Sequence, residues 1–236
     1  MTQHNPESAE LYLTKHARTS GPRRESLRIQ RLEEHIQTFQ RATICALNQM
    51  LDLKDLNTGV HSTRLAEWAL SVGAGIGIAA ADLRDLEIAA ILHDIGKVGV
   101  PDSVLKKNGP LDADERKIIE KHSEFGWTIL REIPGFERAS LLVLHHHERI
   151  DGKGYPAKLK GEEIPFGSRI VCVVDAFDAM VSDRAYRKGL PMEEALRRLR
   201  NDRSTQFDAR IVDHFIRIAA QEFPDIAAIA DPTISP

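Results

Sequence analysis

The spacing of apolar residues is the feature that most restricts the fold of this 236-residue chain. From Ile29 onward, apolar or small residues recur in alternating steps of three and four, which places them along one side of a helix. Later segments repeat helical spacing, and none alternates between apolar and polar residues over several strand lengths. The sequence therefore predicts an all-α fold, a helical bundle preceded by an N-terminal helix.

The N-terminal region predicts an element ahead of the bundle. Residues 1–24 are polar and lack periodicity, which indicates a loose leader or a fraying helix. The residues that follow at heptad-like spacing are Ile29, Leu32, Ile36, Phe39, Thr43, Ala46 and Met50. This pattern is typical of a dimerisation helix and equally of an amphipathic first helix, and beyond Phe39 we favour packing into the core.

These signals divide the chain into three parts. We expect a leader and possible dimerisation helix over 1–40, a main domain over 41–223 and a weakly ordered tail over 224–236. A homodimer formed through residues 25–50 is one consequence of the dimerisation reading. The helices expected within the main domain cover 61–72, 82–94, 112–131, 137–147, 168–183, 191–200 and 208–223, with starting signals at Asp82, Asp112, Ser168, Pro191 and Asp208.

Composition excludes several classes of protein. The net charge is −3 and no long Lys/Arg block occurs, so binding to a nucleic acid polymer is not expected. The two cysteines, Cys45 and Cys172, lie in apolar helical patterns and are interpreted as small core residues in a reducing compartment. Residues 1–10 lack the apolar region of a signal peptide, and the apolar stretch 69–81 is too short and glycine-rich to span a bilayer. We expect a cytoplasmic protein without a membrane partner.

The segment HDIGK, residues 93–97, is a candidate metal-binding element. His93 and Asp94 end an apolar helix, and a buried carboxylate is costly unless it is paired or bound to a metal. Adjacent side chains diverge by about 100° on a helix, so the two converge only where the helix ends, which Gly96 allows. Lys97 then leaves the helix beside the same site, where its ammonium can meet a phosphate oxygen.

Asp175 is a carboxylate in the apolar helix 170–181, where Asp178 is the other acidic residue. An arginine such as Arg169 or Arg184 could neutralise these carboxylates. We favour metal ligation for Asp175 because the chain is rich in histidine, and a structural role for Asp178.

Histidines complete the candidate site. His61 and His122 are weak signals on their own, whereas His146 and His147 are adjacent and precede a glycine-rich loop that ends in Tyr155 and Pro156. Of the run 145–147, only two rings can face one site, because the first and third lie about 200° apart on a helix. The remaining histidines have no matching partners and are expected at the surface: His4, His16, His35 and His214.

Imidazole and carboxylate ligands without thiolates suit Fe, Mn or Zn. The candidate ligands are too many for one ion and suit two ions about 3.5–4 Å apart, bridged by a carboxylate such as Asp94, as in many phosphoester hydrolases. The chain contains neither a GxSxG element nor a Walker loop that would indicate a different hydrolytic mechanism.

HDIGK, HHERIDGKGYP and DAFDAM occur in this order, and over about 43–215 the chain resembles the HD-GYP family of cyclic di-GMP phosphodiesterases. The resemblance implies an all-α HD-domain bundle, an HD-GYP catalytic domain over 41–223, holding two or three metal ions, usually Fe or Mn. It also implies hydrolysis of cyclic di-GMP to pGpG and often on to GMP.

The resemblance assigns roles to individual residues. It gives as metal ligands His61, His93, Asp94, His122, His146, His147 and Asp175. Lys97 matches a lysine that contacts the scissile phosphate, so Lys97 and Asp94 are the expected catalytic residues. In RAYR, Arg184 and Arg187 match a basic element that binds substrate. The loop residues Gly154, Tyr155 and Pro156 are implied to shape the wall of the site and to contact partner signalling proteins.

Departures from the family pattern refine these expectations. Asn57 stands where members with three metal ions have a glutamate, so we expect a binuclear site and pGpG as the main product. Ala185 and Ala209 replace residues that are often proline, which affects local stiffness more than chemistry. Fewer than fifty residues precede the core, whereas members commonly carry a receiver, PAS or GAF domain, so regulation by a domain of this kind is not visible in the sequence.

Two other functions remain open. One is an HD phosphohydrolase that acts on another nucleotide, including a mixed GMP–AMP cyclic dinucleotide. The other is a module that binds cyclic di-GMP without cleaving it. All seven ligand positions carry competent residues, which favours catalysis.

Overall fold

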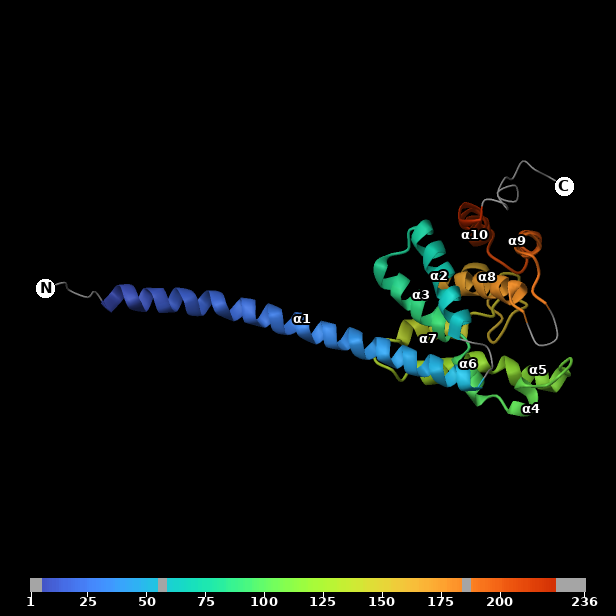
Figure 1. Ribbon diagram of the computed structural model, residues 1–236, viewed down its shortest axis with the longest axis horizontal. Helices are drawn as coiled ribbons and strands as arrows, with labels where there is room; N and C mark the ends of the chain where they lie inside the picture. The colour runs from blue at the N-terminus through green and yellow to red at the C-terminus, as the bar shows by residue number, and fades with distance from the viewer. Residues whose placement is uncertain (1–5, 55–58, 184–187, 224–236) are drawn as a thin grey trace. The chain divides into compact units, whose positions relative to one another are not determined.

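The chain folds into helices, as the sequence predicted. The computed structural model describes residues 6–54, 59–183 and 188–223, and this part of the chain contains no strand, only two isolated bridges that pair Asp151 with Lys160 and Arg203 with Phe207. The α-helices (Figure 1) are α1 (Pro6–Lys54), α2 (Gly59–Ile76), α3 (Ala80–Leu92), α4 (Asp102–Leu105), α5 (Ala113–Glu120), α6 (His122–Leu130), α7 (Glu137–Leu144), α8 (Phe166–Val181), α9 (Met192–Asn201) and α10 (Ala209–Glu222). Two 3-10 helices, η1 (Ile95–Gly99) and η2 (Gly161–Glu163), complete the described elements.

The chain separates into two compact units, residues 1–45 and 46–236. In its described part, the first unit consists of helix α1 from Pro6 to Cys45, and the last residues of this helix, 46–54, belong to the second unit. Residues 1–24 were predicted to be a loose leader or a fraying helix, and they are helical from Pro6 onward, while residues 1–5 lie outside the described part. The predicted tail, 224–236, also lies outside it.

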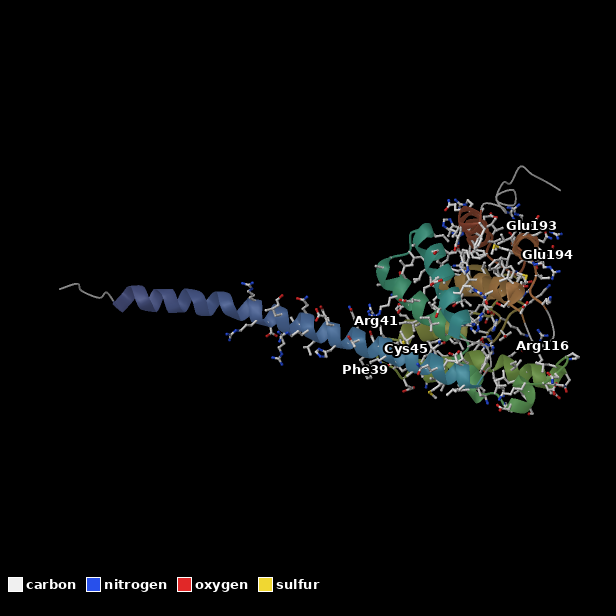
Figure 2. The ribbon with its side chains drawn as sticks, viewed as in Figure 1. Phe39, Arg41, Cys45, Arg116, Glu193 and Glu194 are labelled. Atoms are coloured by element: carbon white, nitrogen blue, oxygen red, sulfur yellow. The ribbon has the colours of Figure 1, made fainter. Side chains whose placement is uncertain are left out.

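The side chains at heptad spacing on α1 are largely exposed. Phe39 and Cys45 are both at the helix surface (Figure 2), so the interpretation of Cys45 as a core residue is wrong. Core packing beyond Phe39 is also wrong for Ala46 and Met50, which are exposed. Leu51 is the buried residue at this end of the helix.

The second unit is a bundle in which α2 packs against α3, α8 and α10, and α3 also packs against α7. Its core includes an aromatic cluster of Trp68, Phe177 and Phe215, with ring centroids 4.8–6.1 Å apart and edge-on contacts. Such contacts add to the large apolar area that each ring buries. Within the described residues, no helix combines the length and apolar character needed to cross a membrane.

Several helix boundaries differ from the sequence prediction. Asp82 is not a cap but lies in the first turn of α3, because the helix begins at Ala80. The helix predicted over 112–131 is divided at Lys121 into α5 and α6, although the capping box of Asp112 and Glu115 is confirmed.

Two further caps were misplaced. Helix α8 begins at Phe166, so Ser168 lies inside it and donates a hydrogen bond to the carbonyl of Leu142 (2.9 Å). Pro191 caps α9 rather than occupying its first turn.

A buried ion pair fixes the start of α10. Asp208 caps the helix, accepting a hydrogen bond from the Arg210 amide (2.9 Å), and also receives the Arg169 guanidinium at 2.7 Å. Both partners are nearly fully buried, and Arg169 also lies over the Phe166 ring at 4.9 Å. Removal of one partner would leave a buried charge without compensation.

We predict that Asp208→Ala lowers the free energy of unfolding by about 3 kcal/mol, the cost typical of breaking a buried ion pair together with a helix cap. Urea unfolding followed by circular dichroism measures this. Asp112→Ala is the matched control, since it removes an exposed cap without a buried partner and should cost clearly less. Equal losses in the two variants would contradict the role given to the buried pair.

Candidate metal centre

The end of helix α3 brings His93 and Asp94 to one place. His93 is the last residue in helical geometry, and Asp94 turns away with φ −94° and ψ 2° before η1 begins. Gly96 then contacts α6 so closely that a Cβ atom would lie 1.8 Å from the His122 carbonyl oxygen. Glycine is therefore required where η1 crosses α6, and this crossing brings Asp94 close to His122.

Two groups of side chains can each hold a metal ion. One consists of His122, His146 and His147, and the other of His61, His93 and Asp175. Within each group, the possible ligand atoms all lie within 4.8 Å of one another. The structure thus brings six of the predicted ligands together from α2, α3, α6, α8 and the turn after α7.

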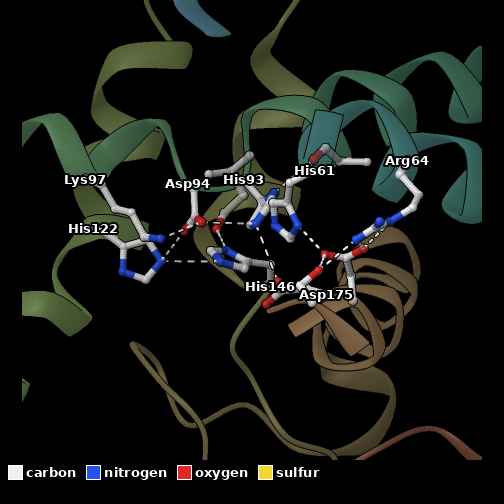
Figure 3. A network of polar contacts seen from close by, with 12 residues as sticks. His61, Arg64, His93, Asp94, Lys97, His122, His146 and Asp175 are labelled. Carbon is white, nitrogen blue, oxygen red and sulfur yellow. Dashed lines mark hydrogen bonds and ion pairs between the residues drawn. The ribbon is translucent and has the colours of Figure 1, made fainter. Parts of the chain in front are cut away.

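Asp94, the seventh predicted ligand, lies between the two groups (Figure 3). Its Oδ2 atom is 3.3 Å from His93 Nε2, and its Oδ1 atom is 3.6 Å from His122 Nε2. Lys97 Nζ lies 2.8 Å from the same Oδ2. One carboxylate therefore presents a different oxygen to each group, so Asp94 could contact an ion held by either group.

Hydrogen bonds to the backbone orient three of the imidazoles. The Nδ1 atoms of His93, His122 and His146 lie 2.6–2.9 Å from the carbonyl oxygens of Ala90, Ile119 and Val143 respectively. A carbonyl oxygen only accepts, so each Nδ1 must carry a proton and the Nε2 atom of each ring faces the site. Histidines that bind a metal through one ring nitrogen typically donate a hydrogen bond of this kind from the other ring nitrogen.

The inward-facing nitrogens fit a cation better than they fit one another. His93 Nε2 is buried without a hydrogen-bond partner in the described structure. His122 Nε2 and His146 Nε2 are 3.4 Å apart, and with both Nδ1 atoms protonated, two lone pairs face each other. Unpaired buried acceptors are costly, and a shared cation removes that cost.

The charges in the site also favour a bound cation. Burial lowers the pKa of His146 and of His147 well below the usual value, and the neighbouring imidazoles lower both further, so the two rings are neutral. Burial also opposes protonation of His93, but Asp94 and Asp175 outweigh it and raise the pKa of His93 to about 9. Lys97 and His93 overcome the effect of burial on Asp94, whose pKa stays well below the usual value. The carboxylates thus favour positive charge at His93 Nε2, where a metal ion would bind.

His61 is oriented by a carboxylate instead of a carbonyl. Its Nδ1 contacts Asp178 Oδ2, and Asp178 also accepts hydrogen bonds from Arg64 Nε (2.5 Å) and Ser182 Oγ (3.1 Å). Burial raises the pKa of Asp178, but His61 and Arg64 outweigh this effect and lower it. The structural role expected for Asp178 fits this geometry, and sequence analysis missed its partner Arg64, three residues after His61.

Asp175 has no ion pair with Arg169, which is bound to Asp208. Its Oδ1 lies 3.6 Å from His93 Nε2. The other arginine considered, Arg184, lies outside the described residues, as do Arg187, Ala185 and Asn57.

The loop that follows the histidine pair is fastened by Glu148, which sequence analysis also missed. This carboxylate is 2% exposed and accepts hydrogen bonds from the amides of Ala157 (2.7 Å) and Leu159 (3.1 Å). The signal in the sequence was its position directly after two candidate ligands.

The same loop brings Tyr155 to the site. A Cβ atom on Gly154 would lie 2.4 Å from the Arg149 amide nitrogen and 2.5 Å from the His147 carbonyl oxygen, so the loop requires glycine at this position. The Tyr155 ring lies 4.8 Å from the His147 ring. Burial and the charge of Asp94 raise the pKa of Tyr155, which keeps the phenol neutral. The peptide bond between Tyr155 and Pro156 is cis.

Two expectations about histidines need correction. Helix α7 ends at Leu144, so His145–His147 occupy a turn, and helical angles are not what separates them; His145 Nδ1 lies 3.7 Å from Glu148 Oε1 instead. His214 is half-buried rather than a surface residue, because its ring fills the space beside Gly75. His35 is exposed as expected, and the side chains of His4 and His16 lie outside the described part of the structure.

Cys172 is half-buried in α8, close to the place expected for it. Its thiol lies 3.7 Å from the Glu148 carbonyl oxygen, and burial raises its pKa to about 12. The thiol is therefore protonated and unsuited to binding a metal.

Comparison with known proteins places this site in a family. Residues 46–211 match the HD domain family. The chain is 38% identical over 188 residues to the cyclic di-GMP phosphodiesterase response regulator RpfG of Xanthomonas campestris, covering 79% of this chain and 50% of that protein. It is 34% identical over 165 residues to 3'3'-cGAMP-specific phosphodiesterase 3 of Vibrio cholerae, covering 70% of this chain and 36% of that protein.

A solved structure supports the fold. The crystal structure of a cyclic GMP-AMP-specific phosphodiesterase from Vibrio cholerae aligns with a TM-score of 0.60 and 21% identity, covering 80% of this chain and 50% of that one. The chain spans half or less of the length of the relatives described above. The chain belongs to the HD-domain family, and its similarity to a protein named as a cyclic di-GMP phosphodiesterase confirms the resemblance predicted from the sequence.

Proposed function

We propose that the chain is a metal-dependent phosphodiesterase that hydrolyses cyclic di-GMP at a binuclear site. The observation that carries this proposal is the position of Asp94, whose two oxygens face two separate groups of metal-type ligands. The substrate is taken from the name of the relative that is 38% identical. A centre of two ions, each able to polarise phosphoryl oxygens and acidify water, suits the hydrolysis of a phosphodiester.

In this proposal, His122, His146 and His147 hold one ion, His61, His93 and Asp175 hold the other, and Asp94 contacts both. The oxygen and imidazole ligand set suits Fe or Mn. Asn57 supports a count of two ions, with pGpG as the main product, although it lies outside the described residues.

Lys97 has two roles in the proposal. Its ammonium lies 2.8 Å from Asp94 Oδ2, which keeps the carboxylate ionised and oriented. Its side chain is only 17% exposed, so a phosphate oxygen that reached it would be stabilised in surroundings with little water to screen the charge.

Substrate contacts beyond the metal centre remain part of the proposal. Arg184 and Arg187 are proposed to bind the substrate and lie outside the described residues. Gly154, Tyr155 and Pro156 form the site wall and a possible contact for a signalling protein. A homodimer through residues 25–50 and a location in the cytoplasm complete the proposal.

The main alternative substrate is a mixed cyclic dinucleotide, since the relative that is 34% identical is named for 3'3'-cGAMP. A phosphohydrolase acting on other nucleotides would not need the loop fastened by Glu148. A module that binds cyclic di-GMP without cleaving it would not need both ligand groups. The presence of both groups favours hydrolysis.

We predict that the protein purified anaerobically and loaded with Fe or Mn converts cyclic di-GMP to pGpG, as followed by chromatography. His93→Ala with Asp94→Ala should abolish turnover and lower the metal content, because it removes the bridge and one ligand. Cyclic GMP-AMP tested in parallel separates the two substrates. Absence of turnover of either substrate with metal bound would overturn the enzymatic proposal.

We predict that Lys97→Gln reduces kcat about 100-fold, the loss typical of removing one charged stabilising group, while metal content stays within twofold. Lys121→Gln, which removes an exposed lysine, is the matched control and should leave both unchanged. An unchanged kcat in Lys97→Gln would rule out the role at the phosphate.

We predict that Asp178→Asn weakens metal binding about 10-fold or more, because neutralising the partner of His61 Nδ1 makes the ring a poorer ligand. Metal titration of the folded variant measures this, and Asp114→Asn, an exposed carboxylate on α5, is the control. Wild-type affinity in Asp178→Asn would show that this carboxylate does not support the site.

A further inference from the structure

Helix α1 carries an apolar seam that continues to its C-terminal end. Alternating steps of three and four connect eight positions: Ile29, Leu32, Ile36, Phe39, Thr43, Ala46, Met50 and Leu53. Thr43 is half-buried and the other seven are exposed, including Phe39 at 68% and Leu53 at 86%. Figure 2 labels Phe39 on the surface of the helix. Seven exposed residues in line on one helix form a continuous strip rather than scattered apolar side chains.

A helix of this kind needs a partner. In the described part of the first unit, α1 is the only element, so that unit has no core of its own. Most of the stability of a helix in a protein comes from packing of an apolar face, not from the helix itself. The repeat of seven residues is the pattern of a coiled coil, in which each helix supplies the same seam to the other.

The residue types on the seam specify the kind of coiled coil. The first position of each heptad, a, is occupied by Ile29, Ile36, Thr43 and Met50, and the fourth, d, by Leu32, Phe39, Ala46 and Leu53. Three of the four a residues are β-branched, and leucine occurs twice at d. In a parallel coiled coil, β-branched residues at a combined with leucine at d favour two strands over three or four.

Charges beside the seam agree with that orientation. In a parallel pair, the residue before each a position faces the residue five places later on the other helix. Arg28 therefore faces Glu33 of a second copy, and this attraction occurs twice by symmetry. Both residues are exposed in the chain, so neither has to leave a buried site to form the contact.

We propose that two copies of this chain associate through α1 as a parallel, in-register coiled coil along Ile29–Leu53. This deepens the homodimer named in the proposed function by giving its orientation, register and contact residues. It rests on α1 alone and is independent of the metal centre. The dimer and the hydrolytic activity can therefore be tested separately.

The first test is mass in solution. Light scattering of the full chain at several concentrations should give twice the chain mass of 26.4 kDa. Ile36→Glu places a charge in the seam and should give a monomer, whereas Gln37→Glu places the same charge beside the seam and should remain a dimer. Circular dichroism confirms that both variants stay helical.

The second test is the orientation. Leu32→Cys in a Cys45→Ser background puts a thiol at a d position, where two copies of a parallel pair meet, so mild oxidation should link the chains. Glu34→Cys in the same background points away from the seam and should yield about tenfold less linked dimer.

Each outcome decides the proposal. A wild-type monomer at all concentrations, or a dimer that survives Ile36→Glu, would overturn the α1 interface. A dimer lost in Ile36→Glu but not linked through Leu32→Cys would overturn the parallel register. None of these measurements depends on hydrolysis. An inactive protein that forms the dimer would support this proposal, and an active protein that stays monomeric would overturn it.

Discussion

The Asp94 carboxylate is the contact on which the rest of the centre depends. It lies just beyond the last helical residue of α3, with one oxygen toward His93 and the other toward His122. That position requires α3 to end at this point and η1 to cross α6 closely enough to exclude a side chain at Gly96. The two groups of candidate ligands come from helices far apart in the sequence, and Asp94 lies between them with one oxygen near each group.

Hydrogen bonds to the Nδ1 atoms orient the imidazole rings toward the site. Three imidazoles are held by carbonyl oxygens and a fourth by Asp178, so their Nε2 atoms all face inward. Glu148 similarly fixes the loop that carries Tyr155. The carbonyl supports lie at helix ends, where the last backbone carbonyls lack the usual partners within the helix.

The sequence was sufficient for the fold class, because apolar periodicity is a local signal. The His and Asp elements also identified side chains that the structure brings close together, and their role as metal ligands stays a prediction. The sequence was less informative about boundaries: Lys121 interrupts a pattern that stays periodic, and Pro165 starts α8 before Ser168. Arg64 and Glu148 were missed because their roles depend on contacts with Asp178 and with the loop at 157–159, which no local pattern encodes. Cys45 and Met50 were assigned to the core because periodicity identifies an apolar face without identifying what covers it.

The most direct test of the centre is the number and separation of Mn²⁺ ions bound by the anaerobically loaded protein. Metal analysis gives the count per chain, and electron paramagnetic resonance reports whether the spins are coupled. A carboxylate bridge predicts two ions per chain, about 3.5–4 Å apart and magnetically coupled. One ion per chain, or two ions without coupling, would contradict a site bridged by Asp94.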